Sequence, residues 1–330
     1  MNYFCAMQAP IRIELPTIYG MKTVNAYLFL DPVPTLIDCG EKTTASWNAL
    51  AAALKEHGLQ ISNIEQVIIT HAHVDHIGMA GKIAEHSKAQ ILVNEYCYTW
   101  ATNKEEMWAR RMQLIERTMP NETGRTPGRF KKMILAFMEN VVNHWDNVPA
   151  ERVQVFPMNG TLNFGGGDWE TIYAPGHANM QTCFYQANNK WLIAADMLLR
   201  ITPTPVMDVS IHDKKVRDKG LVQLLDSYKK MAAMDIATVY PGHYETFTNH
   251  RAIIKMQVDR IHVRIEECFA LIQGGTHGFM DLLNTLYTNR ISMPAMSMLI
   301  GYLDMLTDTG RVEMRTLENG KRGYFAISQK

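Results

Sequence analysis

The chain lacks three features that would assign a protein to a broad class at once: excess charge of one sign, paired cysteines and long apolar runs. Lys plus Arg and Asp plus Glu each number 33 in 330 residues, so composition indicates no general attraction to nucleic acid or anionic membranes. No stretch approaches the roughly 18 apolar residues of a membrane span, and the first residues lack a secretion-signal pattern. We therefore expect a cytoplasmic protein with no membrane partner.

Cysteine is also scarce. The chain has five cysteines, which is an odd number, and none of them forms a C-x-x-C pair. This usage is typical of reduced thiols rather than of a disulfide framework. The five are Cys5, Cys39, Cys97, Cys183 and Cys268.

The order of strand and helix patterns predicts a layered α/β fold. Strand-like runs are expected at residues 11–15, 24–30, 34–40, 65–70, 90–95, 151–156, 161–164, 169–174, 181–186, 190–196 and 237–243. Helical spacing is expected at residues 43–59, 79–89, 213–234 and 249–272. Sheets with helices packed on their faces satisfy this alternation.

Two departures from the alternation suggest the domain organisation. Helical spacing persists over about residues 95–147, which predicts a two-helix hairpin inserted in a large domain of residues 1–274. Residues 275–330 give two helices and a hairpin that turns at Asn319 and Gly320, an order similar to that of a small winged-helix domain.

One short segment carries a high density of metal-binding side chains. His71, His73, Asp75 and His76 stand within six residues, directly after an apolar strand. Imidazole and carboxylate groups suit a divalent ion of the zinc type. An extended loop that leads into a helix can direct some of these groups to one ion and the rest to another.

Three later segments have the same form, a strand followed by a polar turn. They end at His177, Asp196 and His243. Because strand ends gather at one edge of a layered α/β fold, we expect these side chains to meet the first four.

The sequence resembles the metallo-β-lactamase superfamily in its H-x-H-x-D-H segment followed by a later His, Asp and His, over roughly residues 11–250. The resemblance implies a four-layer αββα fold and two divalent metal ions. It implies that His71, His73 and His177 hold the first ion, that Asp75, His76 and His243 hold the second, and that Asp196 bridges both. Asp38 matches the family's first acidic motif and would support the site. Zinc is the expected metal, with iron or manganese as alternatives.

The metals imply the chemistry. Two ions about 3.5 to 4 Å apart share a hydroxide and polarise the scissile group, so a metal-dependent hydrolase is expected. Asp75 and Asp196 are the predicted catalytic residues. The leading expectation is a small-molecule ester, thioester or lactone, as in the glyoxalase II-like hydroxyacylglutathione hydrolases. A phosphodiesterase or endoribonuclease is the alternative, and a non-catalytic metal-binding protein ranks below both.

The inserted region and the C-terminal domain bear on the partner. Several basic residues make the insertion suited to a carboxylate or phosphate on the substrate, although a solvated helix face explains most of them. They are Arg110, Arg111, Arg117, Arg125, Arg129, Lys131 and Lys132. The second C-terminal helix, at residues 293–308, has no Lys or Arg, so no nucleic-acid partner is expected. The sequence leaves the oligomeric state open, a homodimer included.

Overall fold

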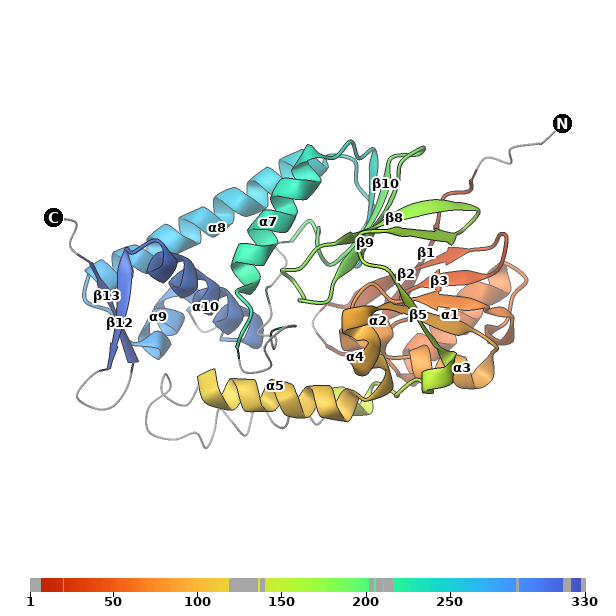
Figure 1. Ribbon diagram of the computed structural model, residues 1–330, viewed down its shortest axis with the longest axis horizontal. Helices are drawn as coiled ribbons and strands as arrows, with labels where there is room; N and C mark the ends of the chain where they lie inside the picture. The colour runs from red at the N-terminus through yellow and green to blue at the C-terminus, as the bar shows by residue number, and fades with distance from the viewer. Residues whose placement is uncertain are drawn as a thin grey trace.

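A computed structural model of the chain places two β-sheets face to face, with helices on their outer faces and further helices at the C-terminal end (Figure 1). It describes residues 7–19, 21–118, 136, 140–201, 205, 210, 216–288, 291–316 and 322–327, with the side chains of 115–118 left aside. No helix within these ranges has the length and apolar character needed to cross a membrane.

The first sheet has six strands in sequence order. The first three pair antiparallel, and the later pairs from the third strand onward are parallel. The strands are β1 Ile11–Pro16, β2 Thr23–Phe29, β3 Thr35–Ile37, β4 Gln66–Ile68, β5 Gln90–Asn94 and β6 Val153–Phe156.

The second sheet has the order β11-β10-β9-β8-β7, and only its β10-β11 pair is parallel. Its strands are β7 Thr161–Phe164, β8 Gly167–Tyr173, β9 Thr182–Gln186, β10 Trp191–Ala195 and β11 Thr238–Pro241. Gly165 and Gly166, both at positive φ, make the tight turn between β7 and β8.

Three apolar clusters define the layers. Between the sheets, Tyr27 and Phe29 of β2 pack against an aromatic group from the second sheet that includes Phe164 and Trp169. A second cluster lies on the outer face of the first sheet, and a third lies on the outer face of the second sheet. Since the outer clusters include helix residues, the order of layers is αββα, and the predicted α/β fold is confirmed.

The helices follow the apolar spacing of the sequence. In the first outer layer, α1 begins where Thr43 accepts a hydrogen bond from the backbone N–H of Ser46, a standard N-cap. The helices of the outer layers include α1 Thr44–Glu56, α2 Val74–Ile77, α3 Ala80–His86, α7 Gly220–Ala233 and α8 His250–Gln273. Single 3₁₀ turns occupy η1 Ile61–Asn63, η2 Glu95–Cys97 and η3 Ala150–Arg152.

The expected long helix over residues 213–234 is wrong at its start, because α7 begins only at Gly220. Residues 216–219 lie outside any helix, and the basic side chains of Arg217 and Lys219 reach the C-terminal segment instead. Arg217 makes two hydrogen bonds of 2.7 and 2.6 Å to Asp304, and Lys219 pairs with Asp308. Charges that were expected within a helix therefore hold two parts of the fold together.

The insertion begins with two helices, a short α4 Tyr98–Thr102 and α5 Lys104–Thr118. Asn103 separates them, and its side-chain oxygen accepts a hydrogen bond from the backbone N–H of Glu106. Residues 140–143 of the predicted hairpin are helical, whereas Arg125, Arg129, Lys131 and Lys132 fall outside the described residues.

The C-terminal segment has the predicted order of two helices and two paired strands. These are α9 Phe279–Tyr287, α10 Met293–Asp308, β12 Val312–Thr316 and β13 Arg322–Ala326. Helix α10 packs so closely on α7 that a Cβ at Gly301 would lie 2.7 Å from the Cβ of Leu221. The expected turn at Asn319 and Gly320 lies outside the described residues.

Candidate metal centre

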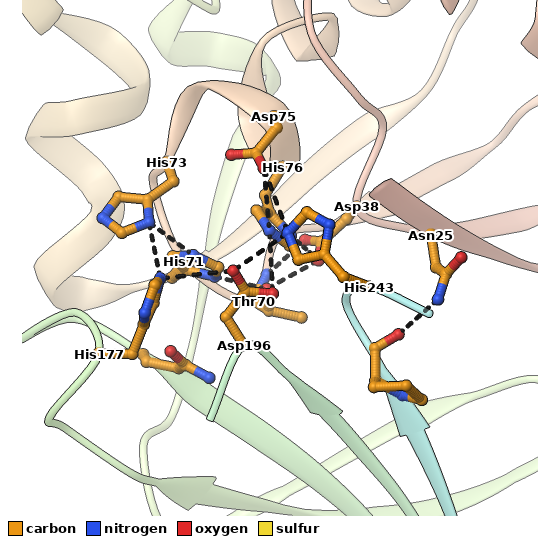
Figure 2. Close-up of polar contacts among 12 residues, drawn as sticks. Asn25, Asp38, Thr70, His71, His73, Asp75, His76, His177, Asp196 and His243 are labelled. Carbon is orange, nitrogen blue, oxygen red and sulfur yellow. Dashed lines mark hydrogen bonds and ion pairs between the residues drawn. The ribbon is translucent and has the colours of Figure 1, made fainter. Parts of the chain in front are cut away.

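The seven metal-binding side chains predicted from the sequence converge on one point at the edge of the two sheets (Figure 2). Four come from the segment after β4, where the chain passes from an extended loop into α2. The other three follow β8, β10 and β11 of the second sheet. The seven are His71, His73, Asp75, His76, His177, Asp196 and His243.

Three histidines form one side of this centre. The Nδ1 atom of His73 lies 3.1 Å from Nε2 of His71 and 2.9 Å from Nε2 of His177. Their donor atoms lie within 4.8 Å of one another, so one ion could contact all three. We call His71, His73 and His177 the histidine trio.

The other side of the centre is mixed. Oδ2 of Asp75 lies 3.4 Å from Nε2 of His243 and 3.8 Å from Nε2 of His76. These three donor atoms also lie within 4.8 Å of one another. We call Asp75, His76 and His243 the mixed trio.

Asp196 stands between the two trios. Its Oδ1 lies 3.4 Å from Nε2 of His76, and its Oδ2 lies 3.4 Å from Nε2 of His177 and 3.3 Å from Nε2 of His243 (Figure 2). One carboxylate therefore reaches donors of both trios.

A second carboxylate supports the centre from behind. Oδ2 of Asp38 lies 2.7 Å from Nδ1 of His76 and accepts a hydrogen bond of 2.8 Å from the hydroxyl of Thr70. The same hydroxyl lies 3.0 Å from Nδ1 of His71. Such partners fix the ring orientation of a ligating histidine.

Sequence reasoning identified Asp38 but missed Thr70, whose only signal was its position directly before His71. It also missed the support of His243, whose Nδ1 lies 2.6 Å from the backbone carbonyl of Thr23. Asn25 donates to the carbonyls of Pro241 and Tyr244, which holds the turn that carries this histidine. These partners are distant in sequence and become visible only once the turn after β11 meets β2 of the other sheet.

The two trios differ in their proton affinities. Burial, together with neighbouring histidines, holds the pKa of His71 and of His73 well below the ordinary value. Burial opposes the charge of His243 too, but Asp196 and Asp75 raise the pKa of that imidazole to about 10. The histidine trio is therefore neutral in the metal-free protein, whereas the mixed trio holds protons.

The donors suit divalent ions. Within the described part of the chain, no hydrogen-bond partner satisfies the buried Nε2 of His76 or the buried Oδ1 of Asp196. A Cβ at Gly242 would lie 2.1 Å from that Asp196 oxygen, so glycine keeps the space beside it clear. Buried imidazoles and carboxylates left without partners are costly unless a cation binds them, and this set matches the preferences of zinc and related metals.

Comparison with known proteins supports this interpretation. The family model described as the metallo-beta-lactamase superfamily matches residues 20–243. Among curated proteins of Bacillus subtilis, the probable metallo-hydrolase YqjP is 25% identical over 263 residues, which are 78% of each chain. The probable metallo-hydrolase YflN is 21% identical over 238 residues, or 68% of this chain and 83% of that one.

Solved structures share the fold over almost the whole chain. A metallo-β-lactamase family protein of Thermus thermophilus has a TM-score of 0.79 at 21% identity and covers 96% of this chain and 98% of its own. A β-lactamase domain protein of Burkholderia ambifaria has a TM-score of 0.76 at 17% identity, with coverage of 96% and 92%. The C-terminal helices are thus part of the shared fold. The chain belongs to the metallo-β-lactamase superfamily and is a metal-dependent hydrolase of that family.

Proposed function

We propose that the centre binds two divalent ions, with zinc as the expected metal, and hydrolyses an ester, thioester or lactone. The histidine trio would hold one ion, the mixed trio would hold the other, and Asp196 would bridge them. The observation that carries this proposal is the position of Asp196, whose two oxygens face donors of both trios. A structural zinc site closes with four ligands and has no use for a second set.

When bound, such a pair of ions makes water a nucleophile at neutral pH and withdraws electrons from the scissile carbonyl. The protein's own part is to place and accept protons. The Asp75 carboxylate lies at the edge of the mixed trio and is more exposed than Asp196, with 16% of its side chain accessible against 7%. Asp75 is therefore positioned to accept the proton of the attacking water, while Asp196 stays a ligand.

The C-terminal segment favours a small-molecule substrate over nucleic acid. We interpret this segment as a winged-helix-like module whose second helix, α10, is a packing element. Nine residues of α10 are buried, and its Asp304 and Asp308 pair with the chain just before α7. A recognition helix needs an exposed basic face, which α10 lacks. We therefore place the protein nearer to glyoxalase II-like hydrolases than to endoribonucleases.

Elemental analysis of the purified protein, paired with a substrate panel, tests the proposal. Thioesters, aryl esters and lactones would be compared with bis-aryl phosphodiesters and short RNA, with Asp196→Asn as the inactive reference. Two metals per chain with acyl turnover is the expected result. Phosphodiester turnover alone would replace the acyl assignment, and one metal or none would contradict the dinuclear site.

A further inference from the structure

His177 differs from the other three histidines whose Nε2 atoms face the centre. In His71, His76 and His243 the second ring nitrogen, Nδ1, has a hydrogen-bonding partner that fixes the orientation of the ring. Among the residues that the structure describes, none pairs with the buried Nδ1 of His177. The backbone turn that carries His177 must therefore place this imidazole.

This turn, residues 174–181, connects β8 to β9, and helix α7 holds its beginning. The hydroxyl of Ser227 donates a hydrogen bond of 2.7 Å to the carbonyl of Pro175. A Cβ at Gly176 would lie 2.4 Å from the Cα of Leu224, so glycine allows the turn to rest directly on the backbone of α7. These contacts fix the start of the turn against the outer helix layer.

Asn94, the last residue of β5, holds the other end of the turn from the opposite sheet. Its Nδ2 donates hydrogen bonds of 2.6 Å to the carbonyl of Met180 and 2.7 Å to the hydroxyl of Thr182. Its Oδ1 accepts hydrogen bonds of 2.9 Å from the backbone N–H groups of Tyr96 and Cys97. The amide is buried and both of its ends are paired, so neither the donor nor the acceptor can be lost without cost.

The segment that Asn94 holds also contacts the strands that lead to two other ligands. The backbone N–H of Thr182 donates a hydrogen bond of 2.9 Å to the carbonyl of Thr70, one residue before a histidine of the histidine trio. The Nε2 of Gln181 donates a hydrogen bond of 3.0 Å to the carbonyl of Ala194, two residues before the carboxylate that faces both trios. Asn94 therefore fixes the turn at the point where it meets the other ligand-bearing segments.

We propose that Asn94 is a positioning residue that places His177 in the histidine trio and thereby sets the metal affinity of that side of the centre. The proposal rests on the metal centre proposed above but not on its substrate. Asn25 is the counterpart on the other side, because its buried amide donates to two backbone carbonyls of the turn that carries His243 (Figure 2). Each trio thus depends on one buried asparagine that reaches across from the first sheet.

Zinc competition with a chelator tests this proposal in variants that keep one trio complete. In a His243→Ala background, which retains the histidine trio, Asn94→Asp should lower zinc affinity about 10-fold. Aspartate keeps the size of the side chain and its acceptor, but it cannot donate both hydrogen bonds to the turn. The added negative charge attracts a cation, so a fall in affinity cannot come from that charge.

Asn25→Asp is the matched control, because it makes the same change at a similarly buried amide on the other side of the centre. In the His243→Ala background it should change zinc affinity by no more than about twofold. In a His177→Ala background, which retains the mixed trio, the order should reverse: Asn25→Asp should lower zinc affinity about 10-fold, and Asn94→Asp should have little effect.

Two outcomes would overturn the proposal. The first is an unchanged zinc affinity of Asn94→Asp in the His243→Ala background. The second is an equal loss of affinity from Asn94→Asp in both backgrounds, because a general weakening of the fold would affect both trios alike. Thermal unfolding of the metal-free variants would measure that weakening separately.

Thr182→Val covers the case in which Asn94→Asp does not fold. Valine keeps the shape of the side chain but removes one of the two acceptors of Asn94. A few-fold loss of zinc affinity is expected at the histidine trio in the His243→Ala background, and an unchanged affinity would contradict the proposal. A wild type that binds one ion per chain or turns over no acyl substrate would refute the proposed function alone, because these affinities are measured without turnover.

Discussion

The two sides of the metal centre differ in chemistry although one loop contributes to both. The histidine trio consists of imidazoles whose pKa values burial and mutual repulsion lower. In the mixed trio, burial opposes the charge of both imidazoles, but Asp196 and Asp75 raise the pKa values of His76 and His243, and Asp38 adds to the rise at His76. A set of neutral imidazoles and a set of protonated imidazoles beside carboxylates therefore stand next to each other. The difference indicates that the two metal positions differ in proton coupling and that the mixed trio carries the proton chemistry.

The largest effect is expected from removing Asp196, the residue that joins the histidine trio to the mixed trio. Asp196→Ala should abolish hydrolysis, because its two oxygens face His76 on one side and His177 and His243 on the other. The fold should persist, since the sheets pack through a separate aromatic core. The loss of hydrolysis would be measured as turnover and metal content, and circular dichroism would check that the variant is folded. Undiminished turnover would rule out the dinuclear mechanism.

Proton release on metal binding distinguishes the two trios next. His243, with a pKa raised to about 10, is protonated at pH 7 and must lose its proton to ligate a metal. The pKa of His76 is raised as well, so that histidine must also lose a proton. Affinity at the mixed trio should therefore rise by up to about tenfold per pH unit for each of these two protons from pH 7 toward 10, whereas affinity at the neutral histidine trio should change little above pH 7. Chelator competition at pH 7, 8 and 9 measures both.

The histidine variants are the controls for that experiment. His243→Ala should keep one metal whose affinity hardly depends on pH above 7, and His177→Ala should keep one metal with the steep dependence. The sign follows for the metal-free fold as well: the raised pKa of His243 contributes stability that is present below its unfolded pKa of about 6.5 and is lost as the pH rises through about 10. Identical pH slopes in the two variants would contradict the assignment.

Substitution of Asp38, which supports the mixed trio, should have a smaller effect on metal affinity and activity. Asp38→Asn keeps the size of the side chain but removes the charge that faces Nδ1 of His76 at 2.7 Å. Loss of such a partner lowers metal affinity or activity by about 10- to 100-fold. Thr70→Val is the companion variant, because it removes the hydroxyl's hydrogen bond to Asp38 and its contact with His71 but leaves the charge of Asp38 in place. Its loss should be the smaller of the two, and the reverse order would count against an electrostatic role for Asp38.

The comparison also explains what the sequence could and could not predict. All seven donors were predictable because each follows a strand, and strand ends of such a fold meet at one edge. The support of His243 by Thr23 and Asn25 was not predictable, since it depends on backbone carbonyls that come near these residues or His243 only through tertiary packing. The role of residues 216–219 was missed for a similar reason. They were expected at the start of a helix, but the acidic partners of Arg217 and Lys219 lie nearly ninety residues later.

The smallest expected effect concerns the support of the histidine trio from the C-terminal helices. Asn179, two residues after His177, donates a hydrogen bond of 3.0 Å to Asp218, and the neighbouring Arg217 pairs with Asp304 of α10. Asp304→Asn should loosen the turn that carries His177 and lower metal affinity at the histidine trio by a few-fold, about 1 kcal/mol or less, because the link is indirect.

Asp308→Asn supplies the matched control, since Asp308 forms the more exposed pair with Lys219 on the same two elements, with 45% of its side chain accessible against 16% for Asp304. The measurement is zinc competition with a chelator in both variants, alongside the slope with pH. A few-fold loss confined to Asp304→Asn would tie the C-terminal helices to the histidine trio. Equal zinc affinities of Asp304→Asn and Asp308→Asn would mean that the C-terminal helices support the fold without influencing the metal centre. A loss confined to the ion whose affinity depends on pH would mean that Asp304 supports the mixed trio instead of the histidine trio.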